Sequence, residues 1–338
     1  MAQATLTRNS DTQRVWADVN PQTGRAALVK EETTLHQPVL LAEAIEQMAV
    51  AAGGIYLDAT LGDGGHTLAI LQQAAHGTRV LGIDRDPRSL SRASQRLEQF
   101  GSRFIPAQGN YADMVTLAAE EGFRSVDGIL MDLGLSSRHL EGAGYGFSFM
   151  RDEPLDMRYD PDGPLTAADI VNTYDEVELR RIIFDYGEER RAPALARAIV
   201  RNRPIHTTGG LAALVVRTLG TGRGRNIHPA TRTFQAIRIA VNDELASLEN
   251  GLAAAVSLLR STGRLLVISY HSLEDRLVKT FLAREAAQCI CPPRTPICIC
   301  GHQPTMGIIN RRVIKTTAQE VQANPRSRSA RMRVAVRL

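Results

Sequence analysis

One turn constrains what this chain can fold into more than any other feature. The segment Asp58–Thr67 reads Asp-Ala-Thr-Leu-Gly-Asp-Gly-Gly-His-Thr and lies between a short strand-like run and an apolar helical run. This order predicts a strand, a glycine turn and a helix. Gly62, Gly64 and Gly65 carry no Cβ, so the backbone of the turn can approach a ligand closely. A second predicted strand ends at Asp84, and an acid in that position binds an adenosine ribose in α/β sheets.

The turn favours S-adenosylmethionine (SAM) over NAD as the adenosine cofactor. Thr67 stands where a dinucleotide fingerprint would have its third glycine. Asp58 can face the cationic sulfonium and amino groups of SAM, whereas it would repel the anionic pyrophosphate of NAD. A βα turn without a ligand is the alternative, and Asp84 argues against it. We therefore predict a SAM site that includes Asp58, Gly62 and Asp84.

Six apolar runs bounded by glycine or aspartate are predicted to be strands. They are residues 55–60, 79–84, 103–107, 126–133, 264–270 and 333–338. Because helical stretches separate them, they predict a doubly wound, mostly parallel α/β sheet. The interval between the fourth and fifth strands is far too long for one crossover. We therefore expect a core domain of residues 35–141 and 229–338, an inserted helical substrate-recognition domain of residues 142–228, and a flexible extension of residues 1–34.

The inserted segment is predicted to begin with a loop of glycines and aromatics and to continue as two helices. The second helix has an apolar stripe around Ile199, and Arg197 and Arg201 lie on another face. These arginines form either a solvated face or a surface that contacts RNA phosphates. Arg232 belongs to the clearest helix of the chain, which is predicted over residues 229–259, and is a further candidate for RNA contact.

The charge balance leans basic, with 40 Lys and Arg against 36 Asp and Glu and a pI near 9.0. This balance is compatible with a nucleic-acid partner. Arg326 and Arg328 lie in a basic C-terminal loop that serves either solubility or phosphate contact. No apolar run approaches the roughly 20 residues that span a bilayer, and the N-terminus lacks the apolar core of a signal peptide. A cytoplasmic protein without a membrane partner is expected.

All four cysteines fall in one short segment, as two Cys-x-Cys pairs on either side of a proline-rich stretch. They are Cys289, Cys291, Cys298 and Cys300. A cytosolic protein keeps such cysteines reduced, so a structural disulfide is not expected. Four thiolates can hold one tetrahedral zinc ion. The usual knuckle spacing is Cys-x-x-Cys, so a thiol-rich loop without metal is the alternative.

The fourth predicted strand ends in Asp132. Ligands of open α/β sheets bind beyond the carboxyl ends of the strands, which places Asp132 beside the cofactor. A carboxylate there can accept an N–H of an exocyclic amine, localise the nitrogen lone pair and later help remove the proton. Methylation at C5 of cytosine would need a cysteine nucleophile, and no cysteine is near the first five strand ends in sequence. The pattern therefore argues for methylation of nitrogen.

The segment after the fifth predicted strand supplies further candidates for the target pocket: His271, Ser272 and Glu274. His271 and Ser272 are predicted to be catalytic together with Asp132. For Glu274 and Asp275 a second interpretation is equally good, because acids at this position cap and favour the N-terminus of the next helix.

Several segments spread along the chain resemble the RsmH (MraW) family. Besides the glycine turn they are residues 36–43, 82–87, 127–137, 228–245, 269–276 and 324–331. That family consists of SAM-dependent methyltransferases that modify N4 of a cytosine in the decoding centre of 16S ribosomal RNA. The resemblance implies a class I methyltransferase core with a C-terminal antiparallel strand and an inserted helical domain. It also implies 16S RNA or the small ribosomal subunit as partner, and leaves open a monomer or a homodimer.

The resemblance further implies which residues contact SAM. The positions that match the family's motifs are Gly64, Gly65, His66, Asp84, Tyr111, Asp132 and His139. Tyr111 is expected to flank the adenine, where the family often has Phe. His139 departs from the Gln that is common there, and residues 1–34 have no counterpart in shorter members.

Two other classes of protein are weighed against this interpretation. An NAD-dependent oxidoreductase is disfavoured by Thr67 in place of the third glycine and by Asp58. A ribosome-assembly factor that keeps the fold without catalysis is the second alternative, and it would not need Asp132 for its function.

Overall fold

The computed structural model describes residues 38–338 except 75–76, 143, 222–227, 293–294 and 296. The predicted N-terminal extension, residues 1–34, lies outside the described residues. Among the helices that are described, none is both long and apolar enough to cross a membrane.

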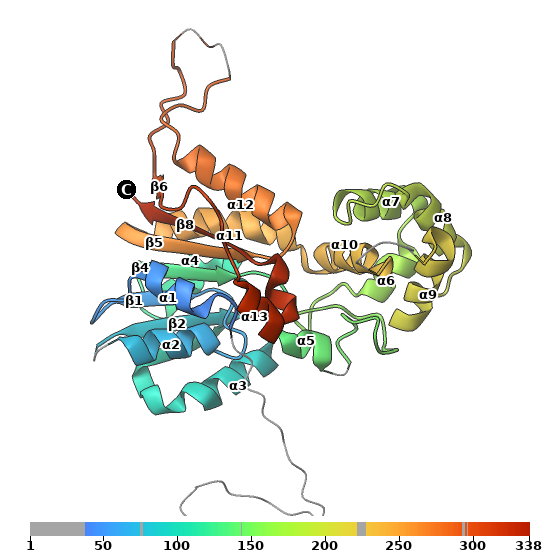
Figure 1. Cartoon of the computed structure of the whole chain (residues 1–338), viewed down its shortest axis with the longest axis horizontal. Helices are drawn as coiled ribbons and strands as arrows, with labels where there is room; N and C mark the ends of the chain where they lie inside the picture. The colour runs from blue at the N-terminus through green and yellow to red at the C-terminus, as the bar shows by residue number, and fades with distance from the viewer. Residues whose placement is uncertain (1–37, 75–76, 143, 222–227, 293–294, 296) are drawn as a thin grey trace, which may run out of the picture. The chain divides into compact units, whose positions relative to one another are not determined.

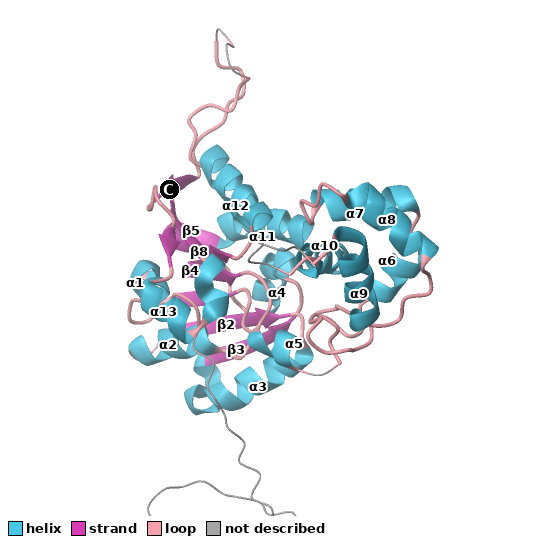
Figure 2. Cartoon of the chain, turned by 45° about the vertical axis from the view of Figure 1, so that its right-hand side comes forward, coloured by secondary structure: helices cyan, strands magenta, loops and turns pink. Residues whose placement is uncertain are grey.

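An eight-stranded sheet forms the centre of the core (Figures 1 and 2). Its strands run in the order β3-β2-β1-β4-β5-β8-β6, with β7 paired to β8. Strands β1 to β5 are parallel, and β8 is antiparallel to β5, which confirms the predicted fold class. The strands are β1 (Ile55–Asp58), β2 (Arg79–Asp84), β3 (Phe104–Gln108), β4 (Val126–Asp132), β5 (Leu259–Ser269), β6 (Met306–Ile308), β7 (Ile314–Lys315) and β8 (Arg331–Arg337).

Helices cover both faces of the sheet because successive strand residues point to opposite sides. Tyr56 packs into the layer under α1 (Leu41–Met48), α2 (Gly65–Gln73) and α3 (Pro87–Leu97). Its neighbour Leu57 packs into the opposite layer, under α4 (Met114–Glu120), α11 (Glu244–Leu258) and α12 (Ser272–Glu285). Both side chains are almost fully buried. Burial of an apolar side chain of this size contributes about 1.5–3 kcal/mol, so each face is firmly held.

The carboxyl edge of the sheet, where β1, β2 and β4 end, carries three acids. The register of the strands sets how far each acid lies along the strand direction. Asp58 pairs with Gly82 of β2 and with Leu130 of β4. Asp84 and Asp132 therefore extend two residues beyond Asp58. The glycine turn follows β1, between the longer β2 and β4 on either side.

The inserted segment forms a helical unit with its own hydrophobic core. After α5 (Ser137–Glu141) it contains α6 (Ala167–Thr173), α7 (Glu176–Asp185), α8 (Ala192–Arg201) and α9 (Thr208–Leu219). The prediction of two helices was therefore wrong, because the described part of residues 142–228 holds four after the loop. Capping boxes start α6 at Thr166 and α7 at Asp175. The capping-box pattern is visible in the sequence and indicates the start of each of these helices. The apolar stripe around Ile199 of α8 is confirmed.

The single helix predicted over residues 229–259 is also wrong. The chain forms α10 (Ala230–Asn242) and α11, which meet at Asp243 in the left-handed region with φ 50° and ψ 45°. Phe234 and Ile237 of α10 pack into the core of the insertion. Leu248 of α11 packs under the sheet instead. The regular apolar spacing in the sequence therefore serves two separate cores.

Candidate active site

The three glycines of the turn have different surroundings. Gly62 has φ 52°, and a Cβ there would meet nothing within 4 Å, so its backbone faces open space. A Cβ on Gly64 would lie 3.0 Å from Cδ1 of Leu97, and one on Gly65 would lie 2.3 Å from Cγ of Pro38. Gly64 and Gly65 thus allow close packing within the protein. Gly62 is the position where a ligand can approach the bare backbone.

Asp58 at the end of β1 is buried within the protein. One carboxylate oxygen accepts a hydrogen bond of 2.8 Å from the hydroxyl of Thr67, and the other accepts one of 3.3 Å from the backbone N–H of Thr60. Burial raises the pKa of Asp58 to about 6, against the lowering effect of these hydrogen bonds. Thr67, at the position of the missing third glycine, therefore holds the acid that starts the turn. A direct contact between Asp58 and the sulfonium stays a prediction.

Asp84 at the end of β2 organises the turn from the neighbouring strand. Its carboxylate accepts hydrogen bonds from the backbone N–H of Gly62 at 2.8 Å and of Asp86 at 2.9 Å. Burial raises its pKa. The acid thereby fixes the open glycine against the carboxyl edge of the sheet, where the sequence predicts the ribose.

His139, in α5, connects this edge to the first aromatic residues of the insertion. Its Nε2 lies 3.4 Å from a carboxylate oxygen of Asp86, and its Nδ1 lies 3.1 Å from Oγ of Ser136. The ring packs among those of Tyr145 and Tyr159, at 5.1 and 5.4 Å between centroids. His139 therefore lies close to the loop that carries Asp84.

Asp86 is a residue that the sequence analysis missed. It caps α3 just before a proline, a sequence signal of a helix start, and it accepts a hydrogen bond of 3.2 Å from the hydroxyl of Tyr145. Burial opposes its ionisation, but hydrogen bonds from His139 and Arg88 hold its pKa well below the usual range. A carboxylate that stays charged at this position ties the insertion to the carboxyl edge.

Asp132 at the end of β4 combines partial burial with access. Its side chain is 21% exposed, and one oxygen accepts a hydrogen bond of 2.8 Å from the hydroxyl of Tyr270. Its other oxygen lies 3.8 Å from Nδ1 of His66, whose Nε2 lies 3.1 Å from the backbone oxygen of Val39. Burial raises the pKa of Asp132 to about 7, although the bond from Tyr270 works against the rise. A carboxyl group with this pKa can accept and release a proton near neutral pH.

Tyr111 lies beyond β3, in a 3-10 turn of residues Tyr111–Asp113. Its ring packs so closely on Gly251 of α11 that a Cβ there would come within 2.6 Å of Tyr111 Cδ2. Burial raises the pKa of its hydroxyl, so the group stays neutral. Its role beside an adenine stays a prediction.

His271 and Ser272 are both engaged in other contacts. His271 is the N-cap of α12, forms a capping box with Glu274 and places its Nε2 3.1 Å from the Glu274 carboxylate. This contact supports the helix-cap interpretation for Glu274. Asp275 instead pairs with Arg331 and Arg333 of β8 at 2.9 and 2.8 Å. Neither geometry assigns a catalytic role, which for His271 and Ser272 stays a prediction.

Ser272 links the core to the insertion. Its hydroxyl donates a hydrogen bond of 2.7 Å to Glu188, which follows α7 and also accepts a bond of 2.9 Å from Arg276. The hydrogen bond from Ser272 and that from Arg276 hold the pKa of Glu188 below its usual value.

A polar cluster at the break between α10 and α11 was also missed by the sequence analysis. Arg238 forms a two-pronged ion pair with Glu244 at 2.7 and 2.8 Å, and the hydroxyl of Tyr159 donates to Glu244 at 3.1 Å. Glu244 lies together with His271 and Glu274, with ligand-type atoms within 4.8 Å of one another. The cluster joins the insertion to the segment that follows β5.

The predicted RNA-binding arginines lie on three separate elements. Arg197 and Arg201 are on α8, and the side chains of both arginines are exposed. Nε of Arg197 lies 3.5 Å from a carboxylate oxygen of Glu176. Arg232 on α10 donates to the backbone oxygen of Glu188 at 3.2 Å. Arg326 and Arg328 are exposed in the 3-10 turn Pro325–Ser329. The four cysteines lie elsewhere, in the segment between α12 and β6.

The residues at the carboxyl edge fit SAM. Open backbone at Gly62 gives the ligand access, and Asp132 offers a carboxylate to a cationic centre. A mostly parallel sheet with an antiparallel β8, a glycine turn after β1 and acids after β2 and β4 define a class I SAM-dependent methyltransferase.

The chain belongs to the MraW methylase family, whose model matches residues 33–338. It is 53% identical over 317 residues to ribosomal RNA small subunit methyltransferase H of Thermomicrobium roseum. The matched region covers 93% of this chain and 97% of that protein. It is 52% identical over 303 residues to the protein of the same name from Dehalococcoides mccartyi, with 90% and 86% covered. Among solved structures, an rRNA methylase of Streptococcus thermophilus matches with a TM-score of 0.41 at 10% identity, over 90% of this chain and 98% of that one.

Proposed function

We propose that this methyltransferase modifies the exocyclic N4 of a cytosine in the decoding centre of 16S ribosomal RNA. The relatives from Thermomicrobium roseum and Dehalococcoides mccartyi are named for ribosomal RNA of the small subunit, which supports that RNA as substrate. The single observation that carries the choice of an amino nitrogen is Asp132, a partly exposed carboxyl group with a pKa raised to about 7 at the end of β4.

Asp132 supplies the chemistry that an exocyclic amine requires. The nitrogen lone pair of such an amine is delocalised into the ring, so the group is a poor nucleophile. When Asp132 accepts one N–H of the amine as a hydrogen bond, the lone pair becomes more available. Bound SAM supplies an electrophilic methyl group attached to a sulfonium. Transfer of that methyl group to the amine would form an N–C bond, break the S–C bond and require the nitrogen to lose one proton, which Asp132 can accept.

Tyr270 and His66 position Asp132. The hydroxyl of Tyr270 occupies one carboxylate oxygen at 2.8 Å, and the ring of His66 approaches the other at 3.8 Å. His66 is itself oriented by the backbone oxygen of Val39. Because the Asp132 side chain is partly exposed, a cytosine base of the RNA can reach it from the solvent side. This arrangement holds the acceptor in one orientation before the substrate arrives.

Exposed arginines of the insertion, of α10 and of the C-terminal turn are the proposed contacts with RNA phosphates. Arg197, Arg201, Arg232, Arg326 and Arg328 are all exposed. Phosphate contacts of this kind fix the orientation of an RNA without selecting a base. In this proposal, the residues at the carboxyl edge of the sheet select the cytosine.

The deciding experiment transfers labelled methyl from SAM to small-subunit RNA and maps the modified base. Naked 16S RNA and assembled small subunits are tested in parallel. One methyl group on N4 of a single decoding-centre cytosine is expected. A label on carbon, on a ribose or on another RNA would contradict the proposal. Binding to small-subunit RNA without any methyl transfer would favour an assembly factor instead.

A further inference from the structure

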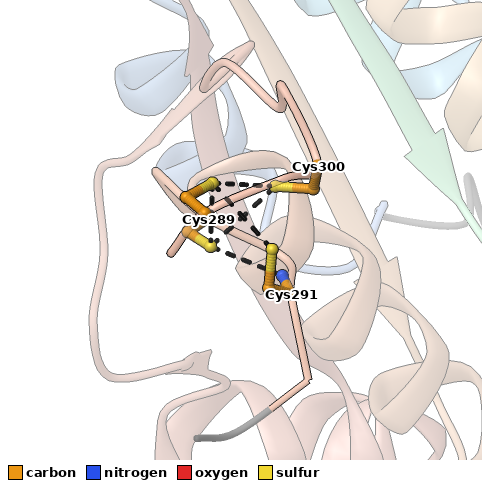
Figure 3. A group of neighbouring side chains, drawn as sticks. Cys289, Cys291 and Cys300 are labelled. Atoms are coloured by element: carbon orange, nitrogen blue, oxygen red, sulfur yellow. Dashed lines mark hydrogen bonds between the residues drawn. The ribbon is translucent and has the colours of Figure 1, made fainter. Parts of the chain in front are cut away.

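The four cysteines converge on one point, although the sequence spacing is unusual. They lie on the segment that leaves α12 and returns to β6, which extends away from the sheet in Figure 1. Figure 3 shows the sulfur atoms of Cys289, Cys291 and Cys300 pointing toward one another. The thiols of all four residues are free. Each Cys-x-Cys pair contributes two sulfurs from one arm of the loop.

The distances between the sulfur atoms match a tetrahedral metal site. The Sγ atom of Cys298 lies 3.5 Å from that of Cys289, 3.9 Å from that of Cys291 and 3.5 Å from that of Cys300. The Sγ atoms of Cys300 and Cys289 are 3.8 Å apart, and all four lie within 4.8 Å of one another. A zinc ion bound to sulfur at about 2.3 Å in a tetrahedron requires sulfur–sulfur separations of about 3.8 Å.

Backbone donors around the sulfurs support thiolates. The N–H of Cys291 donates to the sulfur of Cys289 at 3.4 Å, and the N–H of Ile299 donates to the sulfur of Cys291 at 3.4 Å. Such bonds stabilise negative charge on sulfur and orient the ligand toward a metal. His302 belongs to a different contact, because its Nε2 lies 3.0 Å from the backbone oxygen of Arg284.

Hydrophobic burial does not account for this arrangement. The side chains of Ile297 and Ile299 are 77% and 83% exposed, and Cys289 and Cys298 are exposed as well. Among the described residues between 289 and 300 no apolar side chain is buried, so apolar burial there does not offset the conformational entropy that is lost when these residues are ordered. Metal–sulfur bonds supply the missing free energy in small loops of this kind.

We propose that Cys289, Cys291, Cys298 and Cys300 bind one zinc ion as four thiolates. All four ligands come from the protein, so no position is left for water or substrate, and the site is structural. Its role is to hold the segment between α12 and β6 in one conformation. The proposal is independent of methyl transfer, because none of these residues belongs to the candidate active site.

The test is metal analysis of the full chain, expressed without a histidine tag and purified without chelator. One equivalent of zinc per chain is expected, and Cys298→Ser and Cys300→Ser should each lose it. His302→Ala is the matched control and should keep one equivalent. Replacing zinc with cobalt should produce the visible absorption bands of a tetrahedral tetrathiolate site in the parent chain and in His302→Ala, and not in the cysteine variants.

Two results would overturn the proposal. The first is a folded parent chain that contains no zinc after exposure to excess zinc and removal of the unbound ion. The second is two disulfides found by mass spectrometry in protein kept under reducing conditions. Circular dichroism of the cysteine variants checks that the rest of the chain is folded. Protease cleavage between residues 289 and 300, faster in the variants than in His302→Ala, would support the proposed structural role.

Discussion

Asp132 gains its properties from two neighbours that are remote in sequence and from its own burial. The hydroxyl of Tyr270, the ring of His66 and the burial of the β4 end act on one carboxyl group. Burial raises its pKa and makes it a better proton acceptor when ionised. Tyr270 limits that rise, so part of the population is ionised at neutral pH. Each effect can be measured separately.

Asp132→Asn should reduce the rate of methyl transfer by about 10²–10⁴-fold, because the amide cannot accept the amine proton. SAM binding, measured by calorimetry, should persist. Asp127→Asn is the matched control. Asp127 is the second residue of the same strand, at its other end, where it accepts a hydrogen bond of 2.7 Å from the backbone N–H of Ile55. Full activity in Asp132→Asn would remove Asp132 from the mechanism.

The rate of methyl transfer should depend on pH through Asp132. The ionised form is the active one, and its pKa is raised to about 7, so the rate should rise with pH up to about 7 and level off above it. Tyr270→Phe removes a hydrogen bond that favours the ionised form. The rising limb should therefore move to higher pH in that variant. An unmoved limb in a single-turnover pH profile would show that Tyr270 does not act through Asp132.

Among the elements, the junction of α10 and α11 decides how the insertion connects to the core. Asp243 adopts φ 50°, which costs a non-glycine residue about 1–2 kcal/mol. The turn places Glu244 against Arg238 and Tyr159. The regular spacing of apolar residues across this point predicts one helix, because periodicity does not report a single left-handed residue.

Asp243→Val should destabilise the protein by about 1–2 kcal/mol or more, because a β-branched residue tolerates this conformation poorly. Asp243→Gly should stay within about 1 kcal/mol of the parent, since glycine adopts positive φ readily but gains freedom in the unfolded chain. Glu249→Val, at an exposed position inside α11, controls for helix propensity and should cost less than about 0.7 kcal/mol. Urea denaturation measures all three. Equal losses for the two valine variants would contradict the assigned strain.

At the scale of the whole molecule, three hydrophobic cores are present, and polar contacts join the core of the insertion to the two cores of the sheet. One core lies in the insertion and α10, and the others lie on the two faces of the sheet. Between them lie the bonds of Glu188 to Ser272 and of Asp86 to Tyr145. The contact of Glu188 with Ser272 is exposed, and an exposed polar contact contributes less to stability than buried apolar packing.

The double variant Arg197→Ala, Arg201→Ala should bind small-subunit RNA more weakly and with a smaller salt dependence. Each lost phosphate contact reduces the slope of log K against log salt by about 0.7–0.9. The exposed ion pair of Arg197 with Glu176 contributes little stability, so folding and SAM binding should be unchanged. Arg124→Ala, an exposed arginine just before β4 at the opposite edge of the sheet, serves as control. An unchanged slope in the double variant would make these arginines a solvated face.

Strands β1 to β5 and β8, the glycine turn and the acids at the strand ends were predictable from the sequence, because they depend on local periodicity and on residues adjacent in the chain. The short strands β6 and β7 were not predicted, since two or three residues carry no periodic pattern. Asp58, Asp84 and Asp132 all lie at the carboxyl edge, as predicted.

What those acids contact depends on the fold. Thr67 holds Asp58, Tyr270 reaches Asp132 from 138 residues away, and one apolar stripe divides between two cores at Asp243. Only the folded loop brings four cysteine sulfurs to metal-binding distances from an unusual spacing. Such contacts and the pKa values they produce depend on which segments meet in space, and local sequence patterns do not encode that meeting.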